Sequence, residues 1–467
     1  MKNVLSRSSG RIRASLGMLA LAASLPLAGC GTDELLTVTD PDIINPGDVA
    51  SPAGAEAVRL GALSRFIGTT TGSSGGTFTE TLFVWSGQLA DEWRTGDTFA
   101  QRLQVDQRSI DWSNSGVDNA LRNAHRARLS ATQAVVALRQ YAPAAPAWQI
   151  AEMYFVQGFV ENMLGEYFCS GVAFSTVVDG AEQFGGQATT AETFARALAH
   201  ADSGLALSTG TDANAVRVRN AIMVLRGRIL LNQGNFAQAA AAVSAVPTTF
   251  AYANQHSQTT RDNVNWLMNN NSGRYAVGNN EGGNGLNFAT ANDPRLPVCR
   301  GGDAACKAVG VTNAKPFNTL TTTPYYVQLK WPSRSDPVAV ANGIEARLIE
   351  AEAAYAMGAN GNALPILNAL RATVTGLAPL TDPGTPAGRV DQLFRERAFW
   401  MFGTGHRLGD LRRLVRQYGR PQETVFPVGN FAEGGTYGSD VNFPVPQSES
   451  NNPAVPSGTD LCIDRKA

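Results

Sequence analysis

The sequence lacks the residue clusters that hold metals or nucleotides. No two of its four histidines fall at metal-ligand spacing, and no C-x-x-C pair is present, so zinc is a weaker alternative to disulfides. The glycine-rich run 278–285 follows no expected strand and precedes no P-loop lysine, so it does not predict a phosphate cradle. We expect no metal and no cofactor. The histidines are His125, His200, His256 and His406.

Strong net charge and long apolar runs are also missing. The chain has 38 basic and 39 acidic residues, which gives a formal net charge of -1 at pH 7. This balance gives no electrostatic reason to expect nucleic acid as a partner. Beyond the first 29 residues, no segment is apolar over enough length to span a membrane.

The N-terminus has the features of a bacterial lipoprotein leader. Four basic residues precede the apolar run 16–25, which is too short for a spanning helix. Leu-Ala-Gly-Cys30 follows, and small residues before a cysteine resemble the lipobox, in which the cysteine is acylated. We therefore predict a signal peptide at 1–29, lipidation at Cys30 and a tether at 30–52. An ordinary signal peptide with an incidental cysteine is the alternative.

Four cysteines follow Cys30, and an even number in an exported chain suggests disulfides. Cys299 and Cys306 bracket a short loop that can close on itself. Cys169 and Cys462 would then tie the C-terminal tail to the middle of the chain. Three pairings are possible, and the sequence does not choose between them.

Apolar residues at helical spacing predict a mainly α-helical chain. Residues from about 248 to 335 are rich in Asn and Gly and lose this periodicity, and so long an irregular stretch is usually functional or disordered. We predict one helical domain over 53–467 with this stretch as an insertion. The expected helices are 53–67, 117–141, 148–167, 191–207, 213–232, 236–246, 343–357, 363–374, 390–402 and 406–418.

A short repeat underlies the helices. Residues 231–239 and 355–363 each place an alanine five residues after a glycine that would end a helix. Gly234 and Gly358 suit that position because glycine adopts the left-handed cap conformation without steric cost. This is the pattern of tetratricopeptide (TPR)-like helical pairs, which stack to bury a shared core. An arbitrary helical bundle is the alternative.

Several short motifs, in order, resemble the SusD/RagB family of outer-membrane nutrient-binding lipoproteins. The resemblance implies a TPR-like scaffold with a loop-rich ligand-facing region, and no catalysis. It also implies a cell-surface position, where the protein hands an oligosaccharide or peptide to a SusC-like TonB-dependent transporter. The motifs lie at Asp40–Asp42, Leu225–Ala239, Asp293–Leu296, Glu345–Ala353, Leu367–Arg371, Arg395–Arg397, Gly405–Arg413, Phe443–Pro446 and Asn452–Pro453.

A sugar site needs flat aromatic faces with amides and carboxylates around them. The irregular stretch and an earlier loop supply these residue types. In each case the alternative is that the ring fills the local core. The candidate ligand-binding residues are Trp93, Trp266, Tyr275, Tyr325, Tyr326 and Trp331.

Carboxylates on the later helices suggest a third possibility. Paired carboxylates can hydrolyse glycosides when they face each other across a bond. Arginines nearby in sequence favour a structural role instead, in which ion pairs fix how the helices pack. Two alternatives to solute capture are therefore open: a lipid-anchored TPR-like scaffold that binds only protein, and a hydrolase that uses Glu345 or Glu396.

Overall fold

The computed structural model describes residues 50–73, 80–178, 181–320, 323–358 and 360–467. The predicted signal peptide, Cys30 and most of the tether lie outside these residues. All ten expected helices are present, with their ends shifted by a few residues. They are α2 (Pro52–Thr70), α5 (Ser115–Tyr141), α6 (Ala147–Tyr167), α7 (Thr190–Leu207), α8 (Ala213–Asn232), α9 (Phe236–Val243), α11 (Gly343–Ala356), α12 (Asn360–Arg371), α13 (Pro386–Trp400) and α14 (Arg407–Arg416).

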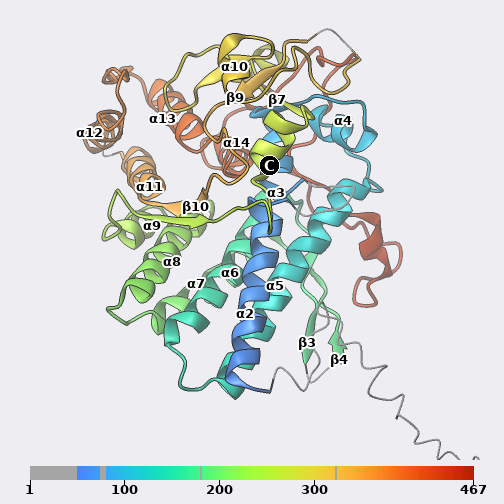
Figure 1. Ribbon diagram of the computed structural model, residues 1–467, viewed down its shortest axis with the longest axis vertical. Helices are drawn as coiled ribbons and strands as arrows, with labels where there is room; N and C mark the ends of the chain where they lie inside the picture. Colours follow the sequence, from blue (N-terminus) through green and yellow to red (C-terminus); the bar gives the residue numbers. More distant parts are fainter. Residues whose placement is uncertain (1–49, 74–79, 179–180, 321–322, 359) are drawn as a thin grey trace, which may run out of the picture. The chain divides into compact units, whose positions relative to one another are not determined.

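The long helices form a scaffold in which each packs on its neighbour in the chain (Figure 1). α2 packs on α5, α5 on α6 and α6 on α7, and the series continues through α8, α9, α11 and α12. Gly234 and Gly358 each have a φ of +75° and follow α8 and α11. The mainly α, TPR-like scaffold is therefore confirmed. Among the described helices, none combines the length and the apolar character that a membrane crossing needs.

Polar residues fix where several helices begin. The Asn114 side chain accepts hydrogen bonds from the backbone N–H groups of Gly116 and Val117 at the start of α5. Thr189 and Glu192 form a capping box at the start of α7. Such caps satisfy N–H groups that have no partner within the helix.

The loop-rich region folds around a core of its own. This core joins Val84 and Trp93 to side chains of the 248–335 stretch and to Phe399 and Phe402 at the end of α13. Its frame is a set of antiparallel strand pairs, with a π-helix at Trp266–Asn271. The pairs are β1 (Trp93–Thr95) with β7 (Tyr275–Val277), β6 (Ala251–Asn254) with β10 (Val338–Asn342), and β8 (Val298–Arg300) with β9 (Tyr326–Gln328).

Two helices near this region were not expected from the sequence. All eight side chains of α3 (Leu82–Leu89) are buried, so its sequence has no polar face for periodicity to detect. α4 (Ala100–Asp106) has only seven residues. The other short elements are β2 (Val172–Ala173), β3 (Thr176–Val178), β4 (Ala181–Gln183), β5 (Gln187–Ala188), α10 (Ala304–Ala308) and α15 (Gln422–Val425).

Two disulfides pair the four cysteines. Cys299–Cys306 closes a loop beside β8, and Cys169–Cys462 joins the end of α6 to the C-terminal tail across 293 residues of sequence. Backbone hydrogen bonds support the second link, because Ser170 N–H donates to Asp464 O at 3.0 Å. Of the three possible pairings, the structure contains the one in which the short loop closes on itself.

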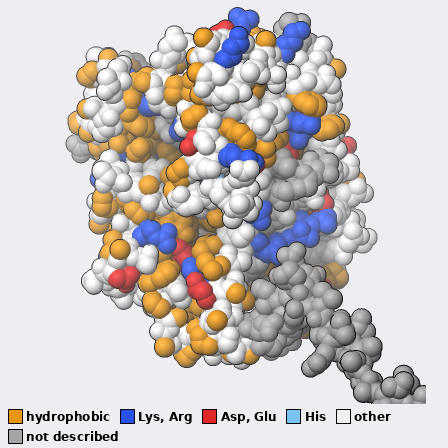
Figure 2. All heavy atoms as spheres, viewed as in Figure 1, with side chains coloured by type: hydrophobic (Ala, Val, Ile, Leu, Met, Phe, Trp, Pro, Cys, Tyr) orange, Lys and Arg blue, Asp and Glu red, His pale blue; other side chains and the backbone are white. Residues whose placement is uncertain are grey.

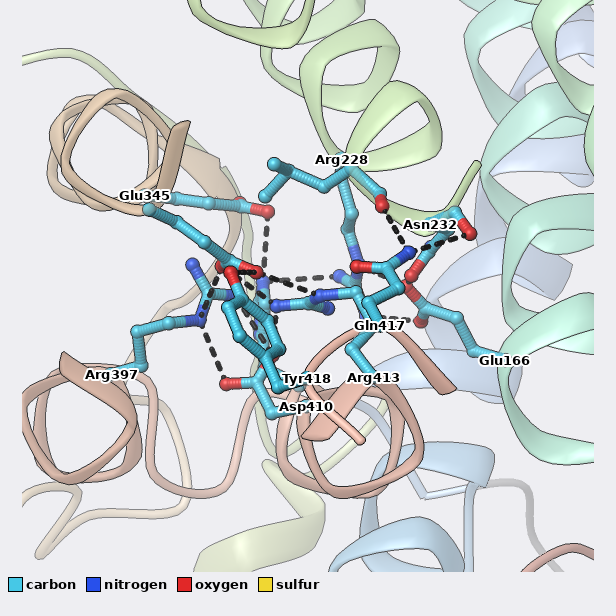
Figure 3. Close-up of polar contacts among 12 residues, drawn as sticks. Glu166, Arg228, Asn232, Glu345, Arg397, Asp410, Arg413, Gln417 and Tyr418 are labelled. Atoms are coloured by element: carbon cyan, nitrogen blue, oxygen red, sulfur yellow. Dashed lines mark hydrogen bonds and ion pairs between the residues drawn. The ribbon is translucent and has the colours of Figure 1, made fainter. Parts of the chain in front are cut away.

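Buried ion pairs join the last helices (Figure 3). Asp410 on α14 accepts two hydrogen bonds from Arg397 on α13, both at 2.9 Å. Arg413, also on α14, donates to the two oxygens of Glu352 on α11 at 3.1 and 2.9 Å. All four residues are at most 1% exposed. Burial alone would raise the pKa of Asp410, but the charges of Arg397 and Arg413 outweigh it and hold that pKa well below its usual value.

The same pattern links α8 to α6 and α11. Arg228 donates to both oxygens of Glu166 at 2.8 and 2.5 Å. The Nε2 atom of His406 lies 3.0 Å from Glu345 and 3.1 Å from Arg228. These contacts confirm the expectation that charged groups on the later helices fix how the helices pack.

We expect Arg397→Met to lower the free energy of unfolding by about 3 kcal/mol or more, because it leaves buried carboxylates short of a cation. Urea denaturation measures this. The matched control is Arg420→Met, which breaks a more exposed pair with Asp391 and should cost less than about 1 kcal/mol. Equal losses for the two variants would contradict a stabilising role for the buried pair.

The lowered pKa of Asp410 adds a pH dependence. An unfolded Asp has a pKa of about 3.9, so the stabilisation is complete above that pH and is lost as the pH falls towards the folded pKa. We expect wild-type stability to fall more steeply than that of Arg397→Met between about pH 5 and pH 3, because the variant has already lost one cation beside Asp410. Parallel curves over this interval would show that the pair does not set the acid sensitivity.

Candidate functional site

Four of the six aromatic residues expected to bind ligand lie in the core. Trp93 and Tyr325 are 1% exposed, Tyr275 is 0% and Trp331 is 6%. The Trp93 ring packs 4.8 Å from that of Phe402. The loop-rich region uses these rings to build its own cores, so their faces are covered. This corrects the expectation that they stack on a ligand.

The other two, Trp266 and Tyr326, are half-buried. The guanidinium of Arg334 lies over the Trp266 ring, 5.4 Å from its centroid. Asp262 fixes that guanidinium through two hydrogen bonds of 2.9 Å. One face of Trp266 is therefore occupied. Ligand contact at Trp266 and Tyr326 stays a prediction.

The groups considered for catalysis are enclosed. Glu396 is 2% exposed and lies between Arg295 and Arg371, each 2.6 Å away. Glu345 is 1% exposed and faces His406. A substrate therefore does not reach either carboxylate in this structure. In the part of the chain that the structure describes, no group of three His, Cys, Asp or Glu side chains is placed to hold a metal.

An exposed tryptophan borders a groove at the start of α5. Trp112 is 53% exposed, and the groove has a volume of about 340 Å³. We call it the Trp112 groove. Apart from the ring of Trp112 and one proline, it presents hydroxyls, amides and a carboxylate. Its lining residues are Trp112, Ser113, Ser115, Asp118, Pro446, Gln447, Ser448, Ser450 and Asn451.

The C-terminal tail forms one wall of this groove. Gln447 N–H donates to Trp112 O at 2.9 Å, and the Ser448 hydroxyl donates to Asp118. A second hollow of about 270 Å³ shares Asp118 and Ser448 and continues along α5 past Arg122 to Leu129. Arg122 pairs with Asp118 at 2.5 Å. Burial, and then the charge of Asp118, raise the pKa of Glu449 in this second hollow.

Two exposed phenylalanines flank an arginine nearby. The Arg274 guanidinium lies 3.8 Å from the ring centroid of Phe317 and 5.0 Å from that of Phe99. Phe317 is 59% exposed and Phe99 is 45% exposed. The carboxylate of Asp97 fixes the arginine, since Arg274 and Arg102 both donate to it, at 3.0 and 2.5 Å. Cation–π contact with Arg274 holds the two rings at the surface.

Hydrogen bonds bring this aromatic stack beside the Trp112 groove. Phe99 immediately precedes α4, and the Gln101 side chain in α4 donates to the Ser115 hydroxyl at 3.3 Å. The Asn114 amide donates back to Gln101 O at 3.1 Å. α4, which Phe99 precedes, therefore adjoins the segment that lines the Trp112 groove, so exposed rings and polar groups occur close together. This combination suits sugars, whose apolar ring faces stack on aromatics while their hydroxyls need hydrogen-bond partners.

Trp112 was not among the ligand-binding residues predicted from the sequence. It lies in the polar run 111–115, directly before the residues that begin α5. The available signal was a single aromatic among short polar residues at a helix start, where little apolar sequence is available to cover it. Phe317 fell inside the predicted insertion, but we did not select it either.

We expect Trp112→Phe to remove the largest share of acrylamide-quenchable tryptophan fluorescence, because its ring is more exposed than the others. Trp266→Phe is the control, since Arg334 covers part of that ring. Stern–Volmer plots for the two variants and the wild type make the measurement. A larger drop for Trp266→Phe would mean that the ring of Trp112 is covered in solution.

The structure is similar to solved SusD-like proteins. One is a SusD superfamily protein from Parabacteroides distasonis, with 13% identity, a TM-score of 0.63 and coverage of 86% of this chain and 98% of that chain. Another is a SusD-like carbohydrate binding protein from Bacteroides fragilis, with 13% identity, a TM-score of 0.62 and the same coverages. No protein-family model and no curated protein matches the sequence. The chain has the SusD fold.

Proposed function

We propose that this protein is a SusD/RagB-like lipoprotein that captures glycans at the cell surface and passes them to a SusC-like TonB-dependent transporter in the outer membrane. The fold match supports the class, because it covers 98% of the length of each of the two solved SusD-like chains. The motifs that resemble the family support it from the sequence, because they occur in order behind the lipobox.

The exposed ring of Trp112 above a groove of hydroxyls and amides carries the proposal. Its chemistry favours a glycan over a peptide. An extended peptide often binds by adding a strand to an exposed sheet edge. The walls of the Trp112 groove are instead the start of α5 and the 3-10 segment Gln447–Asn451, which offer side chains.

We propose binding without turnover. Asp118 and Glu449 both line the adjoining hollow, but Asp118 is already paired with Arg122. Glycoside hydrolysis needs two carboxyl groups on opposite sides of one bond. Steady release of reducing ends from a bound glycan, abolished by Glu449→Gln, would show that the protein is an enzyme.

Trp112→Ala should weaken binding of the recognised glycan at least tenfold, because it removes the stacking face. A tenfold change in affinity corresponds to about 1.4 kcal/mol. A polysaccharide panel screened by affinity electrophoresis identifies the ligand, and calorimetry gives the affinity. The control is Met357→Ala, which removes another apolar side chain (51% exposed) that follows α11 in the scaffold. Unchanged affinity in Trp112→Ala would move the binding site elsewhere.

Cys30→Ser should abolish lipidation. We expect the wild type, expressed in a Gram-negative host, to incorporate labelled palmitate and to enter the detergent phase in Triton X-114. The variant should do neither, because each acyl methylene contributes about 0.8 kcal/mol to membrane affinity. If the variant is still labelled, or if the wild type stays in the aqueous phase, Cys30 is not the anchor.

A further inference from the structure

A small pocket between α2 and α5 gathers three arginines. Arg65 comes from α2, Arg126 from α5 and Arg261 from the loop after β6. Gly68, Thr69 and Asn123 complete the lining, and the volume is about 190 Å³. We call it the arginine pocket. Figure 2 shows a band of Lys and Arg side chains on the face where α5 lies in Figure 1.

These three arginines have no counter-charge among the residues described. No ion pair joins Arg65, Arg126 or Arg261 to a carboxylate there, although neighbours on the same helices are paired. Arg59 on α2, for example, contacts Glu56 and Glu152. Burial, and then the charge of Arg65, lower the pKa of Arg261, as expected for crowded cations. The pocket is thus a site of uncompensated positive charge.

The guanidinium of Arg261 is held in place without a carboxylate. Its Nη1 donates to Ser73 O at 2.8 Å, and its Nε lies 3.4 Å from the Ser64 hydroxyl. The group lies close to Gly68, where an added Cβ would come within 3.0 Å of the guanidinium carbon. In the described structure Nη2 has no hydrogen-bond partner. A guanidinium that is held in place and has a free N–H donor is suited to bind an oxyanion.

Size and charge together restrict what the pocket can accept. Its 190 Å³ is little more than half the volume of the Trp112 groove, and ligand pockets for whole small molecules begin at about 300 Å³. It therefore suits one charged group. No lining residue is acidic. Sulfate and carboxylate both match paired guanidiniums, which bind such groups through two parallel hydrogen bonds.

The pocket lies close to the Trp112 groove along α5. Asp118 in the groove and Arg126 in the pocket are eight positions apart, which is about 12 Å along a helix. Arg122, which is exposed, lies between them and neutralises Asp118. Asp118 and Arg126 are also turned by about 80° relative to each other around the helix axis, so an anionic chain that spans both sites passes over Arg122. It meets no other carboxylate of α5, because Asp118 is the only acidic residue of that helix.

We propose that the arginine pocket binds a sulfate or carboxylate substituent of an acidic polysaccharide whose sugar rings lie in the Trp112 groove. This rests on the proposed glycan-binding function and adds the class of glycan. The net charge of the whole chain is -1, so general attraction of polyanions does not provide such binding.

The test compares the double variant Arg65→Gln/Arg126→Gln with Arg139→Gln, an exposed arginine on α5 outside the pocket. The probes are a sulfated polysaccharide, polygalacturonate, neutral dextran and sodium sulfate. Calorimetry is run at low and high NaCl. We expect the wild type to bind at least one acidic polysaccharide at least tenfold more tightly than dextran. The double variant should lose that preference, and Arg139→Gln should stay within twofold of the wild type.

The outcomes separate this inference from the proposed function. If Trp112→Ala abolishes glycan binding while the double variant binds acidic chains as the wild type does, the arginine pocket is not the anion site and the proposed function stands. If sodium sulfate binds in the pocket but no polysaccharide binds, the pocket takes free anions and the glycan-binding proposal fails. Equal losses in the double variant and Arg139→Gln would show that only general charge matters. Thermal melts confirm that each variant is folded.

Discussion

The structure depends on pairing the buried charges of α14. Arg407, Arg412 and Arg413 are at most 6% exposed, and an unpaired buried charge costs several kcal/mol. Their partners come from three other places. Asp91 from the loop after α3 accepts from Arg407, Glu352 accepts from Arg413, and the last carbonyls of α6 accept from Arg412. α14 can lie in the interior only when all three are in position, so it joins the helical scaffold to the loop-rich region.

This constraint explains what sequence patterns could and could not predict. Scaffold helices such as α5 and α7 have one apolar side, and their caps are local, so their residues were enough to predict them. α6 is buried on all sides from Phe155 to Tyr167, but it is long and follows a proline break, so it could still be predicted. α3 could not be found in this way because its polar residues, such as Ser86 and Gln88, are buried with the apolar ones. Local sequence patterns could not predict the partner of Arg407 either, since Asp91 lies 316 residues earlier.

The candidate site was also harder to predict because contacts between distant segments decide which side chains are exposed. Composition correctly indicated that rings and amides gather in the loops, but the burial of a loop aromatic depends on contacts from distant segments. Tyr275 is covered because β7 pairs with β1, and Trp331 because it packs under the turn after α13. Trp112 stays exposed because the tail segment hydrogen-bonds to its backbone and leaves its ring free. Nothing local in the sequence distinguishes these outcomes.

The contacts of the arginines distinguish those that stabilise the fold from those that are available to a ligand. The buried arginines of α14 have carboxylate or carbonyl partners, so their charge serves the fold. Arg65 and Arg126 are exposed and have no carboxylate partner in the described structure, so the fold gains little from them. Exposed, unpaired cations around a hollow lower stability through mutual repulsion unless an anion joins them. Because the buried pairs already fix the frame, the surface can hold that charge for a ligand.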